Sequence, residues 1–437
     1  MTVPELTLRT AAWYGDGELS LRWPTGWQVT IHRPRPAPPL SDEQIADRLH
    51  AALGQPLAER ARGRRRPVII VDDLNRPTPA ARVIPVLLAQ LAAAGIAAPS
   101  VTILMATGTH GPPQPDGFAK KVGRDAAARC RLAVHDCRGD LVAMGRTSFG
   151  TPILVNPLVH GSDLVLGVGG VYPNEASGFG GGAKLALGVL GFRSIASIHH
   201  RHASAGWGAA DGAGTFRRDL DEIARIIGLR TSLLLLIDAD RAVTDVACGD
   251  VDAVHATLVP VVRDRFRAPL PAPSTRVVVA NTYPIDVSLT FARSKGLEPL
   301  RRAPAGASRI AVAACPEGLG FHGLFPFLNG SAGHRTRMLL LRLPMLLHQP
   351  GQLVEKVARR LVRELRGRRA GKATIPVRPT WVYRPPLSAG GVLPANVPGM
   401  QVTGSWDGIL AAVQREQGGT RTLDTEIYAC APLQWVG

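Results

Sequence analysis

A glycine-rich segment that ends on a lysine carries the clearest chemical signal in this sequence. Residues 167–184 read GVGGVYPNEASGFGGGAK, and three consecutive glycines close the loop: Gly180, Gly181 and Gly182. Glycine permits positive φ and close backbone approach, so such a loop can wrap a phosphate or a flat cofactor. Two familiar phosphate loops do not fit, because Leu185 follows Lys184 where Ser or Thr is needed and Tyr172 stands at a fingerprint glycine. A flexible glycine loop without a ligand is the simpler alternative.

The lysine itself is informative because the chain uses arginine for almost every other cation. Only six of its 51 basic residues are lysine. Arginine keeps its proton, whereas lysine can lose it and form a covalent bond. Lys184 is therefore a candidate for amine chemistry, and Lys295 invites the same argument. The adjacent Lys120 and Lys121 lie in a polar stretch and are expected at the surface.

Histidines supply candidate metal ligands and a candidate base. His199, His200 and His202 follow the glycine loop, and an imidazole nitrogen can bind a metal. Adjacent residues of a helix point in different directions, so the three cannot share one ion, and His200 is the preferred ligand. A histidine cluster at the surface is the alternative. His110 follows Gly108 in a strand-end turn and could act as a general base, or could merely be exposed.

A second polar cluster precedes a predicted helix. Asp73 could cap that helix, and Arg76 could hold a phosphate or a carboxylate through two parallel hydrogen bonds. Taken by themselves, these two residues fit a structural role as well as a functional one.

The elements that carry these residues alternate between strand and helix. Helices are predicted at residues 41–57, with Ser41 as the cap, and at 80–94. Apolar runs typical of buried parallel strands occur at residues 67–71, 101–106, 131–135 and 163–168. This alternation predicts an α/β fold with mainly parallel sheets, whose ligands bind beyond the carboxyl ends of the strands. The three polar clusters each follow such a strand and are expected to share one site.

The length of 437 residues predicts two α/β domains with the active site in the cleft between them. The proline-rich stretch 269–273 marks the boundary, so the domains are predicted at residues 1–268 and 269–437. In the second, a strand at 276–280 precedes a helix that begins near residue 287 and carries Lys295, and another strand spans 309–314. Residues 366–398 are expected to form an irregular connection.

Composition excludes several classes of protein. The net charge of +17 comes from scattered arginines, and no aromatic residues interleave the runs at 60–66 and 359–369, which argues against a nucleic-acid partner. The apolar stretch 338–347 is too short and too charged to span a membrane. Five dispersed cysteines and the absence of a leader pattern at the amino end predict a reducing, cytoplasmic location.

The clusters, taken together and in this order, resemble the lactate racemase family. They are, in chain order, DLNRP at residues 73–77, GTH at 108–110, PNEASGFGGGAK at 173–184, HH at 199–200, and YPID at 283–286 followed by Lys295. The resemblance implies a nickel pincer nucleotide that is joined covalently to Lys184, with His200 as a nickel ligand. It further implies that Asp73, Arg76 and the loop glycines surround the cofactor and that other proteins synthesise it.

In the same resemblance, His110 takes the hydroxyl proton of a small 2-hydroxy acid and Lys295 binds the acid's carboxylate. Asn174 stands where the family has its second catalytic histidine, and Ala292 and Phe291 replace a serine and a tyrosine. The resemblance therefore predicts a racemase or epimerase of a 2-hydroxy acid other than lactate. The alternatives are an enzyme that transfers hydride without racemising its substrate and a ligand-binding homologue without turnover.

Overall fold

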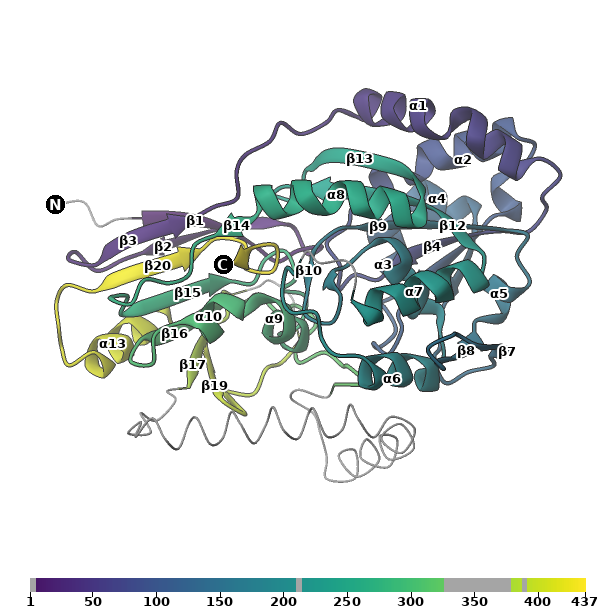
Figure 1. Cartoon of the computed structure of the whole chain (residues 1–437). Coiled ribbons are helices and arrows are strands. Elements are labelled where there is room, and N and C mark those ends of the chain that lie inside the picture. The colour runs from purple at the N-terminus through teal and green to yellow at the C-terminus, as the bar shows by residue number, and fades with distance from the viewer. Residues whose placement is uncertain (1–4, 210–213, 326–378, 387–390) are drawn as a thin grey trace.

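Two mainly parallel sheets, lying side by side, organise the chain in this computed structural model (Figure 1). The structure describes residues 5–209, 214–325, 379–386 and 391–437. The apolar stretch 338–347 and the arginine run 359–369 lie outside the described residues. None of the helices in the described ranges is long and apolar enough to cross a membrane. The expected α/β fold with mainly parallel sheets is confirmed.

The first sheet has six strands in the order β13-β12-β9-β4-β5-β6, and each neighbouring pair is parallel except β12 and β13. Its strands are β4 (Pro67–Asp72), β5 (Thr102–Ala106), β6 (Arg131–Val134), β9 (Leu164–Gly170), β12 (Leu229–Ile237) and β13 (Val243–Asp250). Every residue of β4 and β9 is buried, as expected for strands covered on both faces. Of the predicted strands, β9, β4 and β5 therefore lie inside this sheet, and β6 forms one of its edges.

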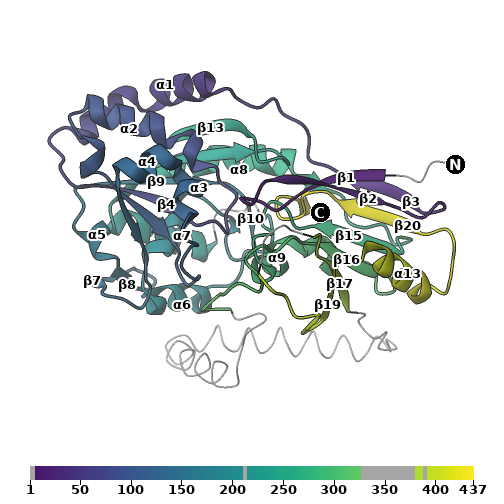
Figure 2. The ribbon, with the colours of Figure 1, turned by 180° about the vertical axis from the view of Figure 1, so that it is seen from behind.

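Helices cover both faces of the first sheet (Figure 2). One apolar core joins the sheet to α1 (Asp42–Ala61) and α2 (Ile84–Ala93), and the other joins it to α6 (Phe192–Arg201), α7 (Thr215–Ile226) and the 3-10 segment Gly182–Val189. Ser41 caps α1 through a reciprocal capping box with Gln44, as its sequence position indicates. Helix α8 (Val251–Arg265) and several shorter elements complete this lobe: α3 (Gly117–Val122), α4 (Arg124–Arg129), β7 (Val142–Arg146), β8 (Pro152–Val155) and α5 (Pro157–His160).

The second sheet has seven strands in the order β18-β19-β17-β16-β15-β20-β3. They are β3 (Gln28–His32), β15 (Val277–Asn281), β16 (Ser308–Val312), β17 (Thr380–Tyr383), β18 (Asn396–Val397), β19 (Met400–Thr403) and β20 (Asp424–Tyr428). Helices α9 (Leu289–Gly296), α10 (Glu298–Arg302) and α13 (Trp406–Glu416) pack with it. Residues 366–398 are thus not wholly irregular, because β17 and β18 lie in that range.

The beginning of the chain belongs to the second lobe, which corrects the predicted division at residues 1–268 and 269–437. Strand β3 pairs with β20, and the hairpin of β1 (Glu5–Thr10) and β2 (Gly17–Arg22) packs on the same core (Figure 1). Trp23 lies in that core and is 1% exposed. The partner of β3 is almost 400 residues away, so no local pattern in the sequence reveals the pairing.

Candidate active site

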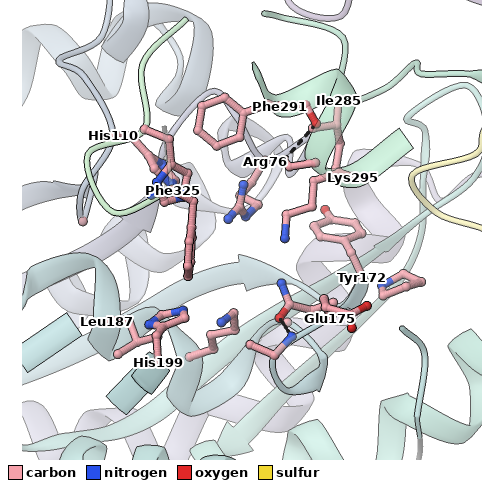
Figure 3. A pocket seen from close by; sticks show the side chains of 18 of the residues that line it. Arg76, His110, Tyr172, Glu175, Leu187, His199, Ile285, Phe291, Lys295 and Phe325 are labelled. Atoms are coloured by element: carbon pink, nitrogen blue, oxygen red, sulfur yellow. Dashed lines mark hydrogen bonds between the residues drawn. The ribbon is translucent and has the colours of Figure 1, made fainter. Parts of the chain in front are cut away.

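A cavity of about 980 Å³ lies between the two lobes and collects most of the residues singled out from the sequence. The first lobe contributes the segments that follow β4, β5 and β9, and the second contributes α9 and the residues after β16. Figure 3 shows Arg76 and Lys295 directed into the space between His110 and His199. The polar residues of the wall are Asp72, Asp73, Arg76, Thr107, Thr109, His110, Asn174, Glu175, Lys184, His199, His202, Ser204, Arg293, Ser294, Lys295, Glu298, Arg301, Arg302 and His322.

The glycine loop needs its glycines for steric reasons. Gly181 and Gly182 have φ of +81° and +57°, in the left-handed region that favours glycine. A Cβ on Gly181 would lie 2.7 Å from the carbonyl oxygen of Gly170, and one on Gly182 would lie 2.9 Å from the Cβ of His255. The loop therefore follows the cavity wall closely and brings Lys184 to it.

Two side chains from the helices behind the loop hold its carbonyl groups. Arg217 of α7 donates from Nη2 to the carbonyl oxygen of Phe179 at 2.7 Å, and His255 of α8 lies 2.9 Å from the carbonyl oxygen of Gly180. Arg217 is 7% exposed. A buried guanidinium that satisfies backbone carbonyls fixes an otherwise pliable loop. Sequence reasoning missed both residues, because they follow the loop by more than 30 positions.

Lys184 lies in this wall as a buried amine. Burial lowers its pKa well below the ordinary value, and the charges of Lys295, Arg76 and Arg217 lower it further. Its Nζ lies 5.2 Å from the centre of the Phe216 ring. An amine with a lowered pKa loses its proton more readily and can then act as a nucleophile, which is the property expected of a covalent anchor.

His199, rather than His200, lines the cavity, while His200 as the metal ligand stays a prediction. Its Nδ1 lies 2.8 Å from the carbonyl oxygen of Ile195 and donates to it, which leaves the Nε2 lone pair available. Burial and the nearby charge of Lys184 lower the pKa of His199 to about 3. A neutral imidazole fixed through its other nitrogen is the usual form of a metal-binding histidine. His200, one position further along α6, does not lie in the wall.

His110 and Asp73 form a buried pair at the ends of β5 and β4. The His110 Nδ1 donates to Asp73 Oδ2 at 2.6 Å. Burial lowers the pKa of His110, so the imidazole is neutral with Nε2 as its acceptor. Burial raises the pKa of the Asp73 carboxyl, but the hydrogen bond with His110 and the charge of Arg76 outweigh that effect and hold it below its usual value. The pair has the arrangement of a general base with its orienting carboxylate. A place for Asp73 beside the cofactor stays a prediction.

Aromatic groups from the second lobe close the space around this base. The rings of Phe291 and His322 lie 4.6 Å and 5.0 Å from the His110 ring. The His322 Nδ1 accepts the backbone N–H of Phe325 at 3.1 Å. His322 was not among the expected site residues, because it stands in an irregular segment without a neighbouring motif.

Lys121 is a buried structural lysine, contrary to the expectation of a surface position. Its side chain is 0% exposed, and Nζ donates to Asp72 Oδ1 at 2.6 Å. It also donates to the carbonyl oxygens of Arg76 and Thr78 at 3.0 and 3.1 Å. These bonds fix the turn that carries Asp73 and Arg76. Helix α3, too short to show a clear apolar face in the sequence, folds Lys121 under that turn.

The hairpin at the beginning of the chain contacts the same turn from the second lobe. The Trp13 Nε1 donates to the carbonyl oxygen of Leu74 at 2.9 Å, and its ring lies 3.8 Å from the Arg241 guanidinium. Arg241 in turn forms an ion pair with Asp16. The two lobes are therefore joined beside the base, by residues that carry no signal in the sequence.

Lys295 and Asn174 reach the cavity from opposite lobes. Burial lowers the pKa of Lys295 to about 7, with a contribution from the charge of Arg76. The Asn174 Oδ1 accepts the backbone N–H groups of Ala176 and Ser177 at 3.0 and 3.3 Å. The oxygen of Asn174 is thus committed to a turn, which leaves the two hydrogens of Nδ2 as its donors.

The fold and the cavity define a two-lobed α/β protein with a deep site that combines histidine, lysine and arginine. Residues 14–211 match the model of the lactate racemase N-terminal domain. The chain is therefore similar to the lactate racemase family over just under half of its length.

Known relatives show the same similarity. The chain is 26% identical over 276 residues to the lactate racemase of Lactiplantibacillus plantarum, and the match covers 62% of this chain and 65% of that protein. It is 27% identical over 305 residues to the lactate racemase of Thermoanaerobacterium thermosaccharolyticum, covering 67% of this chain and 70% of that protein.

Two solved structures share the fold. The lactate racemase apoprotein from T. thermosaccharolyticum has a TM-score of 0.67 at 18% identity and covers 99% of this chain and 100% of its own. A Thermotoga maritima protein has a TM-score of 0.50 at 17% identity, with 65% and 73% covered.

Proposed function

We propose that this protein is a racemase or epimerase of a 2-hydroxy acid other than lactate and that it uses a nickel pincer nucleotide joined to Lys184. The observation that carries the proposal is the presence, in one cavity, of a buried amine with a lowered pKa, a neutral metal-type imidazole and a histidine base paired with a carboxylate. The names of the relatives support the same class of reaction.

The residues present fit such a group. Among the described residues, no three His, Cys, Asp or Glu side chains come together to hold a metal ion. His199 could therefore supply only one ligand, and the prosthetic group would have to supply the others, which agrees with a pincer cofactor. Lys184 would anchor that group, and Gly181 and Gly182 allow the loop that carries it to pack closely against Gly170 and His255. When bound, the cofactor would accept a hydride from C2 of the substrate and return it.

The chain's own residues would prepare the substrate for that transfer. Lys295 and Arg76 would hold the carboxylate, since both are cationic donors directed into the same space (Figure 3). The His110 Nε2 would take the hydroxyl proton, and Asp73 would stabilise the imidazolium that results. Phe291 and Phe325 would exclude water from the reacting atoms.

Asn174 makes the two sides of the site unequal. A racemase handles hydroxyl groups on both sides of C2, but Asn174 offers a hydrogen-bond donor and no proton acceptor there. We therefore expect unequal rates for the two configurations and poor turnover of both enantiomers of lactate. Loading of the site would depend on cofactor-synthesis proteins as partners.

An isotope experiment tests the proposed chemistry. The enzyme, produced together with cofactor-synthesis proteins, is given a panel of 2-hydroxy acids that carry deuterium at C2, in ordinary water. Hydride transfer returns the label to C2 of the product, whereas removal of C2 hydrogen as a proton exchanges it with solvent. Retained deuterium supports the proposal and complete washout contradicts it. Lys184→Arg should abolish turnover, and Lys120→Arg, at a lysine paired with Asp116 outside the cavity, is the matched control.

A further inference from the structure

The mouth of the cavity carries a group of arginines that the reaction described above does not use. Arg301 and Arg302 of α10 and Arg293 of α9 line the cavity together with Lys295. The charge of Arg301 lowers the pKa of both Arg293 and Lys295, in each case in addition to burial, so the three cations are neighbours. Such a concentration of positive charge inside a cavity attracts anions.

Glu298 organises this group instead of neutralising it. Its carboxylate, whose side chain is 7% exposed, accepts the Nε–H of Arg301 and of Arg302, each at 2.8 Å. Among the described residues, both guanidiniums donate their hydrogen bonds from Nε. Their terminal Nη groups therefore remain available as donors. The carboxylates of Glu298 and Glu175 are outnumbered there by three arginines and Lys295, so the mouth keeps a net positive charge.

The burial of Glu298 distinguishes this arrangement from an ordinary surface ion pair. The Arg301 and Arg302 side chains are 48% and 54% exposed, and two exposed partners gain little from pairing. Here the acid is buried at the base of α10 and the arginines extend from it to the cavity. A fixed guanidinium loses less entropy when it binds a carboxylate through two parallel hydrogen bonds.

We propose that Arg301 and Arg302, oriented by Glu298 and assisted by Arg293, form a subsite for a second carboxylate on the substrate. This proposal rests on the proposed function and names its substrate class: a 2-hydroxy acid with a distal acidic group. The 2-carboxylate would lie on Lys295 and Arg76, and the distal carboxylate would lie on the arginines of α10. A diacid also accounts for a mouth far more basic than a small monoacid requires.

The position of the subsite agrees with the distribution of charged side chains around the cavity. Glu175, on the opposite wall, is exposed, and its charge raises the pKa of Lys295 against the effect of burial. The acidic side chain nearest the arginines is Glu298, which is already engaged. A second carboxylate would therefore meet donors at the α10 side of the mouth.

Substrate comparison with charge-removing variants tests the subsite. The loaded enzyme is assayed with lactate, 2-hydroxybutanoate, hydroxysuccinate, 2-hydroxyglutarate and a 2-hydroxy acid with a terminal phosphate. We expect the ratio of kcat/KM for a diacid to that for a monoacid to exceed 10 and to fall about tenfold or more in Arg301→Gln and in Arg302→Gln. The control is Arg129→Gln, whose arginine pairs with Asp125 outside the cavity, and it should leave the ratio unchanged.

Two kinetic results would overturn the proposal: no preference for diacids, or an equal loss of kcat/KM for diacids and monoacids in the variants. A loss of cofactor from the variants would also overturn it, because the arginines would then belong to the cofactor site. A preference for the phosphorylated acid over both diacids would replace the carboxylate with a phosphate. A binding measurement separates this failure from failure of the proposed reaction. Succinate, which cannot react, should bind more tightly than propionate, and Arg301→Gln should remove that difference even if no acid is turned over.

Discussion

The pairing of Asp73 with His110 provides a quantitative prediction for the substitution Asp73→Asn. The bond between Asp73 Oδ2 and His110 Nδ1 is 2.6 Å long, and it lies among the charges of Arg76 and Lys295, both of which lower the pKa of His110. Asparagine can keep the hydrogen bond but not the charge. The imidazolium that forms when His110 takes a proton would then face two cations without compensation.

The magnitude follows from the strength of a charged hydrogen bond. Hydrogen bonds to charged groups contribute about 1.5–3 kcal/mol, and each 1.36 kcal/mol changes a rate about tenfold. We therefore expect kcat to fall by about 10²-fold in Asp73→Asn. Because Asp73 raises the pKa of His110, its neutralisation should also move the acid limb of the kcat/KM profile to lower pH. Chiral separation of substrate and product over time, between pH 4 and 9, measures both effects.

A double-mutant cycle makes this test specific. His110→Ala should lower turnover by about 10²-fold or more, and Asp73→Asn added to it should cost less than about threefold, because the carboxylate acts through the imidazole. Asp125→Asn is the control, since that carboxylate pairs with Arg129 at the surface. Undiminished turnover with an unmoved acid limb in Asp73→Asn, at full cofactor loading, would refute the assignment.

Three further predictions follow from the site. His199→Ala should lose nickel but keep the adduct on Lys184, whereas His200→Ala should keep both; metal analysis with intact mass decides, and the reverse pattern would restore His200 as ligand. Because Lys295 is protonated below its pKa of about 7, kcat/KM should fall as the pH rises through 7, and Lys295→Arg should move that limb to higher pH; a wild-type profile flat between pH 6 and 9 would contradict a carboxylate-binding role. Asn174→Ser keeps an acceptor for the turn but removes the Nδ2 donors, so kcat/KM should fall about tenfold with a melting temperature near that of the wild type; a large loss of stability without a catalytic effect would reduce Asn174 to a turn residue.

The sequence revealed those features that depend on local patterns. Strand β4 is a continuous apolar run, and Ser41 precedes Gln44 at the spacing of a capping box, so both elements were predictable. The chemical role of the lysine at the end of the glycine loop could also be inferred from the sequence, because a run of glycines that ends on a lysine is unusual in this chain. The placement of Lys184 in the cavity wall agrees with that reasoning.

The features that remained hidden depend on tertiary contacts. Whether His199 or His200 faces the cavity depends on the rotation of α6 about its axis, which two adjacent histidines do not specify. The burial of Lys121 depends on how α3 folds beneath the turn after β4, and the pairing of β3 with β20 joins opposite ends of the chain. The positions of His322 and of the arginines of α10 in the cavity depend on how the second lobe packs against the first.

The most direct test of the account is the mass and metal content of the protein made together with cofactor-synthesis proteins. Intact-mass measurement, peptide mapping and nickel analysis are performed on the wild type and on Lys184→Arg. The account predicts a mass above that of the sequence, an adduct mapped to Lys184 and bound nickel, with the adduct and the metal both absent from Lys184→Arg. An unmodified Lys184 in protein that racemises a 2-hydroxy acid would contradict it.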